Sequence, residues 1–322
     1  MADDIGALRA ADVQQARIRD QIERQLGPQI MGWLRSDDVI EIMLNPDGSL
    51  WVERLGKNME QVGTLAASSA ELMMRTVASY IGVNLSAARP ILECELPIDG
   101  SRFEGILPPV VSKPTFTIRR KATKIFTLEN YVAQGVMSQA QADVLEGAIR
   151  SKQNVLVVGG TGSGKTTLTN AILEGISRLD PESRLVIIED TAELQSAAKN
   201  AVQLRTNIDV SMQDALKVTM RLRPDRIVVG EVRGGEALAL IKAWNTGHPG
   251  GVATVHANDA KGGLTRIEGL VAEARPTPAQ QEIAAAINVV VVIGKTAAGR
   301  RVLEMRSVQS WNGREYETTA II

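Results

Sequence analysis

The most informative stretch of the sequence is Val155-Leu-Val-Val158-Gly159-Gly160-Thr161-Gly162-Ser163-Gly164-Lys165-Thr166-Thr167. Residues 159–166 match the pattern G-x-x-x-x-G-K-[ST], which predicts a loop that binds phosphate groups. An apolar run precedes the loop and helix-forming residues follow it, which is the context that this motif requires. The glycines let backbone N–H groups surround a phosphate without clashes from β-carbons, and the start of the helix adds a partial positive charge. We therefore predict that residues 159–167 bind a nucleotide.

Two side chains of this loop have expected roles. Lys165 is predicted to reach the β- and γ-phosphates, and the Thr166 hydroxyl to ligate Mg²⁺. The guanine-reading sequence Asn-Lys-x-Asp is absent from the chain, which favours ATP over GTP. A second Gly-Lys-Thr, at 294–296, has Val289 in the place of the first glycine and no helical pattern after it. A surface hairpin is the better interpretation there.

Acidic residues follow two further apolar runs. The usual second motif of a phosphate-loop enzyme is an apolar strand that ends in aspartate, but Ile227-Val-Val-Gly230-Glu231 ends in glycine and then glutamate. Gly230 has no side chain to bind a metal, so carboxylates are expected from the run Val186-Ile-Ile-Glu189-Asp190-Thr-Ala-Glu193. Both segments are predicted to end at the carboxyl edge of the sheet, beside the phosphate loop. We predict Glu189 and Asp190, with Thr166, as magnesium ligands.

The chain contains two histidines, His248 and His256, in one segment, 247–258. A metal site is not favoured, because no third ligand of suitable type and spacing is visible. One of them is expected to touch the γ-phosphate or to report on it across a subunit interface. Packing and turn roles are the alternatives, more so for His248 than for His256, which follows an apolar strand.

The sequence around these motifs alternates between strands and helices from about residue 127. Strands are predicted at 154–158, 184–189, 201–205, 226–229 and 251–255, and helices between most of them, including 166–178, 211–222 and 235–244. Short continuous apolar strands that alternate with helices indicate an α/β domain with a mostly parallel sheet covered on both faces. Helix starts are predicted at Ser138, with Gln141, and at Thr277, with Pro278 in the first turn. Residues 289–293 and 301–305 predict a closing hairpin.

The first third of the chain is a smaller, irregular α+β region. We predict a helix to about Pro28, a hairpin of 39–44 and 50–53 around Asn45-Pro-Asp-Gly48, a helix over 69–83, and short strands in 91–120. A basic segment, Arg119-Arg120-Lys121 with Lys124, follows. The predicted organisation is an N-terminal α+β domain (1–120), a linker (121–130) and an ATPase domain (131–322).

Composition excludes several functions. The 322 residues are enough for two domains, and 36 Lys and Arg against 37 Asp and Glu give a net charge of −1. Such a balance, with 3% aromatic residues, disfavours general binding to nucleic acid. The single cysteine, Cys94, excludes an internal disulfide and a cysteine-based zinc site. No apolar run approaches the roughly 20 residues that span a bilayer, so we expect a cytoplasmic protein.

The order of these motifs resembles that of the secretion ATPases of type II and type IV systems. In that family the Walker A loop, the Asp box, an atypical Walker B and the His box occur in this order, matched here by 159–166, 189–193, 230–234 and 247–257. The resemblance runs from about residue 90 to 290. Asp99-Gly-Ser-Arg102-Phe, Phe116-Thr-Ile-Arg119-Arg120 and the short N-terminal domain are most like the conjugal-transfer branch, the TrbB-type ATPases. Type II enzymes typically add a tetracysteine zinc element, which one cysteine excludes.

This resemblance implies a homohexamer that binds ATP and Mg²⁺ between the N-terminal domain and a RecA-like C-terminal domain. By similarity, Glu193 and Glu231 serve the magnesium–water chemistry and His256 lies near the γ-phosphate. Arg102 and Arg119 would reach the phosphates, with Arg221 or Arg223 also contributing. The family powers pilus assembly and DNA or substrate transfer. The implied location is the cytoplasmic face of the inner membrane, where the partners are inner-membrane components of the apparatus.

Two other classes of function compete with this motor. One is a nucleic-acid motor of the RecA or helicase class, which the net charge and the few aromatic residues disfavour; no stable nucleic-acid binding is expected. The other is a scaffold that binds ATP but barely hydrolyses it, which the two acidic segments disfavour.

Overall fold

The chain divides into two units, Met1–Thr123 and Lys124–Ile322. The computed structural model describes residues 2–55, 57–121, 125–207 and 209–321, and of residues 2–14 only the helical backbone. Residues 122–124 of the predicted linker therefore lie outside the described residues. Helix α3 (Leu128–Ala133) occupies the end of that predicted linker and begins with a capping box at Thr127.

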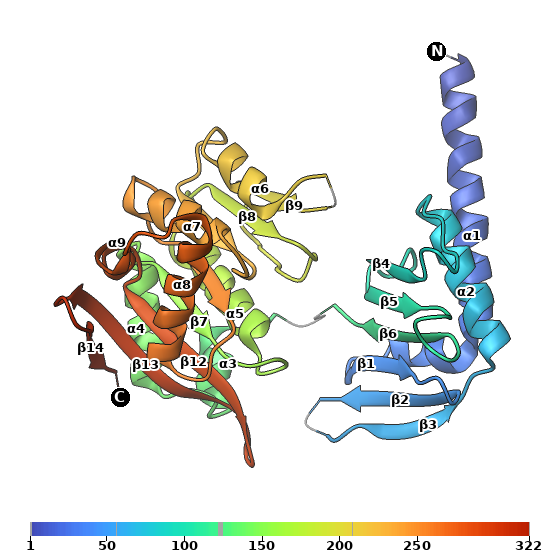
Figure 1. Cartoon of the computed structure of the whole chain (residues 1–322), viewed down its shortest axis with the longest axis horizontal. Coiled ribbons are helices and arrows are strands. Elements are labelled where there is room, and N and C mark those ends of the chain that lie inside the picture. The colour runs from blue at the N-terminus through green and yellow to red at the C-terminus, as the bar shows by residue number, and fades with distance from the viewer. Residues whose placement is uncertain (1, 56, 122–124, 208, 322) are drawn as a thin grey trace. The chain divides into compact units, whose positions relative to one another are not determined.

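In the described part of the first unit, a six-stranded antiparallel sheet has the order β3-β2-β1-β6-β5-β4. Helices α1 and α2 share one hydrophobic cluster with it, in which Leu26, Met73, Ile42 and Phe103 are buried. The elements, labelled in Figure 1, are α1 (Ala2–Leu34), β1 (Val39–Leu44), β2 (Ser49–Arg54), β3 (Glu60–Thr64), α2 (Ala67–Tyr80), β4 (Ile91–Glu95), β5 (Arg102–Ile106) and β6 (Thr115–Arg119).

Two features of this unit differ from expectation. Helix α1 does not end near Pro28: Gly27 leaves helical geometry with φ of 76°, and the chain resumes a helical path to Leu34. Glycine adopts positive φ readily, and proline is tolerated in the first turn of the segment that follows. Strand β3 was not predicted, because its sequence Glu-Gln-Val-Gly-Thr is polar and lies half exposed at the edge of the sheet.

Within the described residues of the second unit, an eight-stranded sheet has the order β14-β13-β12-β7-β11-β10-β8-β9. The six strands from β12 to β9 are parallel, and β13 and β14 add an antiparallel edge. The elements are α3, α4 (Gln139–Arg150), β7 (Val155–Val158), α5 (Lys165–Leu179), β8 (Leu185–Glu189), β9 (Ala201–Arg205), α6 (Met212–Thr219), β10 (Arg226–Val229), α7 (Glu236–Asn245), β11 (Val252–Val255), α8 (Ala260–Ala274), α9 (Gln280–Ala286), β12 (Val289–Thr296), β13 (Gly299–Trp311) and β14 (Tyr316–Ala320).

Helices cover both faces of this sheet (Figure 1). Helices α3, α4 and α5 share a cluster with Val155 and Val157 of β7, whereas α6 to α9 share another with Leu156 and Val158. Successive residues of a strand point to opposite faces, so an all-apolar strand packs against helices on both sides. The predicted parallel α/β domain is present, and its central strands are buried along their whole length.

Three details at the end of the chain differ from the prediction. The closing hairpin is longer than expected, since β12 reaches Thr296 and β13 reaches Trp311, and β14 extends the sheet further. The helix start predicted at Thr277 is wrong: α9 begins at Gln280, and its N-cap is Ala279, whose side chain makes no capping hydrogen bond. In contrast, Ser138 and Gln141 form the predicted capping box at α4. In the part of the chain that the structure describes, no helix has the length and apolarity needed to cross a bilayer.

A buried arginine joins the strand ends opposite the phosphate loop. Arg226, the first residue of β10, has 1% of its side chain exposed. Its guanidinium donates to Asp180 Oδ2 at 2.6 Å, to the Ile149 carbonyl at 2.8 Å and to the Gly250 carbonyl at 3.0 Å. These bonds connect β10 to the ends of α4 and α5 and to the turn before β11.

We expect Arg226→Met to destabilise the second unit, because it removes the shortest ion pair of Asp180 and the guanidinium donor to the Ile149 and Gly250 carbonyls. Breaking a buried ion pair costs about 3–5 kcal/mol, and the lower end applies because Asp180 keeps 23% exposure. Differential scanning calorimetry of the full chain measures the effect. Lys217→Ala, which breaks an exposed pair with Asp214 in the same unit, is the control and should cost under about 1 kcal/mol. Equal melting temperatures for the two variants would contradict the role of Arg226.

Candidate nucleotide-binding site

The candidate site lies where four neighbouring parallel strands end. In the sheet order β7-β11-β10-β8, the phosphate loop follows β7, His256 follows β11, Gly230-Glu231 follow β10, and Glu189 ends β8. Carboxyl ends of parallel strands meet at one edge of a sheet, which is where open α/β folds bind ligands. The motifs that are spread over a hundred residues of sequence thus converge in one place.

The phosphate loop has the conformation that its glycines allow. Gly162 and Gly164 have φ of 65° and 104°, in the left-handed region that favours glycine. Gly164 is the N-cap of α5, and Lys165 is the first residue of that helix. The first N–H groups of a helix lack partners within the helix, so the loop leads directly to a set of available donors.

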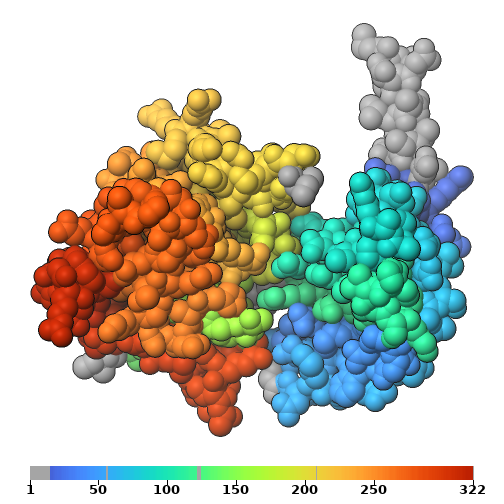
Figure 2. Space-filling view, in the orientation of Figure 1, coloured from blue at the N-terminus to red at the C-terminus, as the bar shows by residue number. Residues whose placement is uncertain are grey.

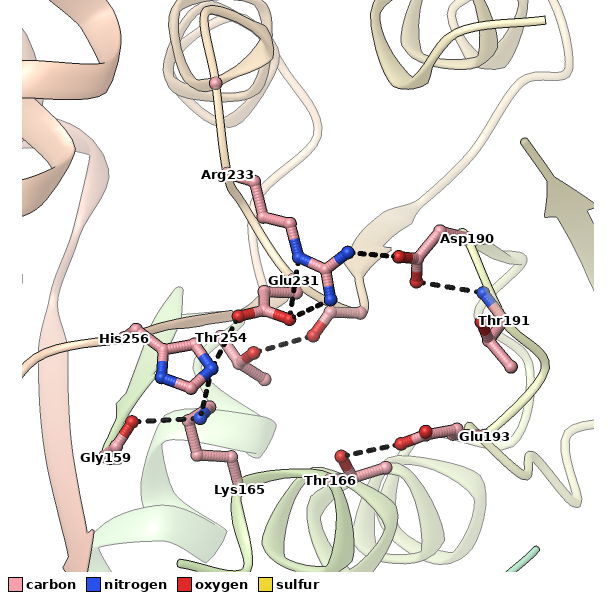
Figure 3. A network of polar contacts seen from close by, with 12 residues as sticks. Gly159, Lys165, Thr166, Asp190, Thr191, Glu193, Glu231, Arg233, Thr254 and His256 are labelled. Carbon is pink, nitrogen blue, oxygen red and sulfur yellow. Dashed lines mark hydrogen bonds and ion pairs between the residues drawn. The ribbon is translucent and has the colours of Figure 1, made fainter. Parts of the chain in front are cut away.

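Lys165 folds back on its own loop. The residue is 9% exposed, and its ammonium group donates to the carbonyls of Gly159 at 2.9 Å and Gly160 at 3.0 Å. The same Nζ lies 3.2 Å from His256 Nε2. Figure 3 shows that Lys165 and His256 point toward one another from α5 and from the end of β11.

Glu193 is the acidic residue beside the loop hydroxyl. Thr166 Oγ1 donates to Glu193 Oε2 at 3.2 Å, and Asn170 Nδ2 of α5 donates to the Glu193 carbonyl at 3.2 Å. The sequence predicted both Thr166 and Glu193 as functional, and the structure brings them together.

The two acidic residues predicted as magnesium ligands with Thr166 are engaged elsewhere. Glu189 is 2% exposed, and its Oε2 accepts the backbone N–H groups of Glu193 and Leu194, both at 2.9 Å. Burial raises the pKa of the Glu189 carboxyl, against the lowering effect of these two donors. Glu189 therefore holds the backbone of the segment that carries Glu193, and Asp190 instead pairs with Arg233.

Arg233 connects the two acidic segments. Its guanidinium contacts Glu231 Oε2 through Nη2 at 2.6 Å and Nε at 3.0 Å, and pairs with Asp190 through Nη1. Sequence reasoning did not single out Arg233. The sequence did contain a signal for a functional role of Arg233, because this residue lies two positions after Glu231 within the motif Gly230-Glu231-Val-Arg-Gly.

His256 joins this network to the phosphate loop. Its Nε2 lies 2.9 Å from Glu231 Oε1, so both carboxylate oxygens of Glu231 have a partner, as Figure 3 shows. Partial burial, followed by the charge of Lys165, lowers the pKa of the His256 imidazole, while Glu231 acts in the opposite direction. The lowered pKa favours the neutral imidazole over the imidazolium. His248 lies apart from these contacts, with Nδ1 2.8 Å from the Pro224 carbonyl, which fits the turn role.

The predicted arginines have surroundings of their own within each unit. Arg102 and Arg119 face one another across β5 and β6 in the first unit, and Arg119 Nε lies 3.9 Å from Glu41 Oε1. Arg120 turns to the carbonyls of Ser36 and Val39 instead. Arg221 and Arg223 are exposed on the segment after α6.

The donors beside the loop suit a hard cation. No group of three or more His, Cys, Asp or Glu side chains arranged for a metal occurs among the described residues. A magnesium ion in phosphate-loop enzymes needs few protein ligands, because waters and substrate phosphates supply the rest. The Thr166 hydroxyl and the Glu193 carboxylate are oxygen donors of that kind and fit such an ion.

Fold and site together define the class of protein. A parallel sheet covered on both faces, with a phosphate loop at its carboxyl edge and carboxylates on the neighbouring strands, is a RecA-like P-loop ATPase. Residues 15–311 match the family described as "Type II/IV secretion system protein". The chain belongs to this family.

Individual relatives agree with this assignment. The chain is 51% identical over 301 residues to the "Probable conjugal transfer protein TrbB" of Sinorhizobium fredii, covering 94% of this chain and 93% of that protein. It is 49% identical over 302 residues to the conjugal transfer protein TrbB of Rhizobium radiobacter, covering 94% of each. The X-ray structure of the Legionella pneumophila ATPase DotB has a similar fold, with a TM-score of 0.60 at 19% identity over 83% of this chain and 76% of that chain.

The network predicts opposite effects of two substitutions on His256. Lys165→Met removes a cation that disfavours the imidazolium, so the pKa of His256 should rise; Glu231→Gln removes an anion that favours it, so the pKa should fall further. A pH titration of the imidazole resonances by NMR measures both. The chain has only two histidines, so a His248→Gln background assigns the signal. Shifts of the same sign in both variants would contradict the arrangement.

Proposed function

We propose that this chain is the ATPase of a conjugative type IV secretion system, a magnesium-dependent homohexamer that powers pilus assembly, DNA transfer or both. We further propose that it works on the cytoplasmic face of the inner membrane, docked on membrane components of the apparatus. The observation that carries this proposal is the chain of contacts from the phosphate-loop lysine through His256 and Glu231 to Arg233 and Asp190. The names of relatives that cover nearly the whole chain support the conjugative role.

Substrate binding would begin at Lys165. The β- and γ-phosphates of ATP are stronger acceptors than the carbonyls of Gly159 and Gly160, so the ammonium group would turn to them. Backbone N–H groups of residues 159–167 and the start of α5 would hold the remaining phosphate oxygens. Thr166 and Glu193 would hold Mg²⁺, which neutralises charge on the phosphates when bound. Of the predicted magnesium ligands, the observed contacts favour this pair over Glu189 and Asp190.

Glu231 is proposed to orient the attacking water. Its two oxygens are held by His256 and Arg233, so it becomes available when Lys165 and His256 turn toward the γ-phosphate. Hydrolysis of ATP depends mainly on positioning and on stabilising charge on the transferred group. Cations from the first unit, Arg102 and Arg119, would add to that stabilisation when the unit closes on the nucleotide, which would couple nucleotide state to motion.

Glu231→Gln tests the water-orienting role. We expect this variant to bind ATP but to turn it over roughly 10²–10⁴-fold more slowly, because a correctly placed base contributes about that factor. Phosphate release and calorimetric ATP binding measure the two properties. Lys165→Ala should lose hydrolysis and binding together, and Glu182→Gln, on an exposed turn, should match the wild type. Normal turnover by Glu231→Gln, or turnover that requires single-stranded DNA and falls with salt, would point to another mechanism or to a nucleic-acid motor.

Arg119→Ala tests the contribution of the first unit. An arginine that stabilises charge in phosphoryl transfer is worth roughly 10³–10⁵ in turnover, so a large loss is expected with unchanged oligomer size in sedimentation. Arg75→Ala, which removes an exposed arginine of α2 that pairs with Glu71, is the matched control in the same unit. If Arg119→Ala hydrolyses ATP at the wild-type rate, the first unit does not complete the site.

A further inference from the structure

The hairpin formed by β12 and β13 lies against the phosphate loop. Strand β12 pairs in parallel with β7, with Val289 opposite Val155 and Val292 opposite Val158. The two strands therefore reach the carboxyl edge of the sheet side by side, where β7 continues into the phosphate loop and β12 into the hairpin. The tip of the hairpin, 295–299, is exposed and stands out from the surface of the second unit (Figures 1 and 2).

Three glycines of the loop face this hairpin. A β-carbon at Gly159 would overlap the Ile293 carbonyl, and one at Gly164 would lie 3.1 Å from Arg300 Cδ. At Gly162 the nearest atom to such a β-carbon is Lys295 Nζ, at 3.5 Å. The hairpin thus packs along the outer side of the loop and brings two cationic side chains to it.

Arg300 makes a directed contact with the loop. Its Nη2 donates to the Gly162 carbonyl at 3.3 Å, and its buried Nε has no hydrogen-bond partner among the described residues. In a trans peptide the C=O and the next N–H point in opposite directions. With the Gly162 carbonyl turned outward to Arg300, the Ser163 N–H turns inward, where it donates to the Gly160 carbonyl at 3.3 Å.

The inward N–H faces the place where phosphate is expected. The Gly160 carbonyl that accepts it also accepts Lys165 Nζ at 3.0 Å, so both donors converge on one acceptor inside the loop. A phosphate oxygen would replace that acceptor for both. Arg300 therefore fixes a peptide whose donor is already aimed at the substrate, and adds positive charge at the rim of the loop.

We propose that Arg300 is a positioning residue for nucleotide binding, and that the β12–β13 hairpin is a functional part of the phosphate site. Arg300 orients the Gly162–Ser163 peptide before the nucleotide arrives, so the loop does not have to reorganise on binding. The proposal rests on nucleotide binding at the phosphate loop. It extends the site to a part of the sequence that carries no recognised motif.

Arg300→Met is the test, because methionine keeps an aliphatic stem against Gly164 and removes the guanidinium. A hydrogen bond from a charged group contributes enough that its loss should weaken ADP binding roughly tenfold. Isothermal titration calorimetry with ADP measures this, and KM for ATP should rise in parallel while kcat falls less. Arg300→Lys restores a donor and should recover part of the affinity.

The neighbouring arginine provides the control. Arg301 is partly exposed and contacts the Gln134 carbonyl at 3.5 Å, away from the loop, so Arg301→Met should bind ADP as the wild type does. The proposal is wrong if Arg300→Met keeps wild-type affinity, or if Arg301→Met loses as much. A melting temperature near that of the wild type shows that the variant is folded. If Arg300→Met melts at a lower temperature, the ADP affinity of Arg300→Lys is compared with that of the wild type instead. Failure of the wild type to bind ADP would instead refute the proposed nucleotide site.

Discussion

The ammonium group of Lys165 is nearly buried, and a buried cation is stable only when acceptors surround it. Two carbonyls of the loop and the ring of His256 supply them. This requirement explains why the ends of β7 and β11 must meet at the start of α5. A parallel sheet with β10 and β8 as the next strands then places Glu231 and Glu189 at the same edge.

One ring nitrogen couples the phosphate loop to the acidic residues. His256 Nε2 lies within hydrogen-bond distance of both Lys165 Nζ and Glu231 Oε1. In a neutral imidazole this nitrogen either carries a proton and donates to Glu231, or lacks one and accepts from Lys165. A continuous series of contacts therefore runs from the phosphate loop to Glu231, and through Arg233 to Asp190.

The sequence was sufficient where a pattern reflects burial. Apolar runs such as 155–158 and 227–229 predicted the parallel sheet, and the phosphate loop predicted its own strand and helix. Edge strands such as β3 and β14 were missed because their half-exposed residues lack that pattern. The contacts of Glu189 could not be predicted for a similar reason: the sequence shows a carboxylate at a strand end, but only the fold shows that backbone N–H groups donate to it. Arg300 was missed because its partner, Gly162, is distant in sequence, whereas Arg233 lies two residues after Glu231 and was overlooked within a recognised motif.

The glycines of the phosphate loop satisfy two separate physical demands. Gly162 and Gly164 have positive φ, a backbone conformation that is strained for residues with a β-carbon. Gly159 has no such requirement, but a β-carbon there would overlap the Ile293 carbonyl of the hairpin. The first glycine of the motif is therefore needed for close packing of β12 on the loop, and the later ones for the turn that exposes the N–H groups. The glycine motif that predicts ligand binding therefore also forms, in this chain, the surface on which a neighbouring strand packs.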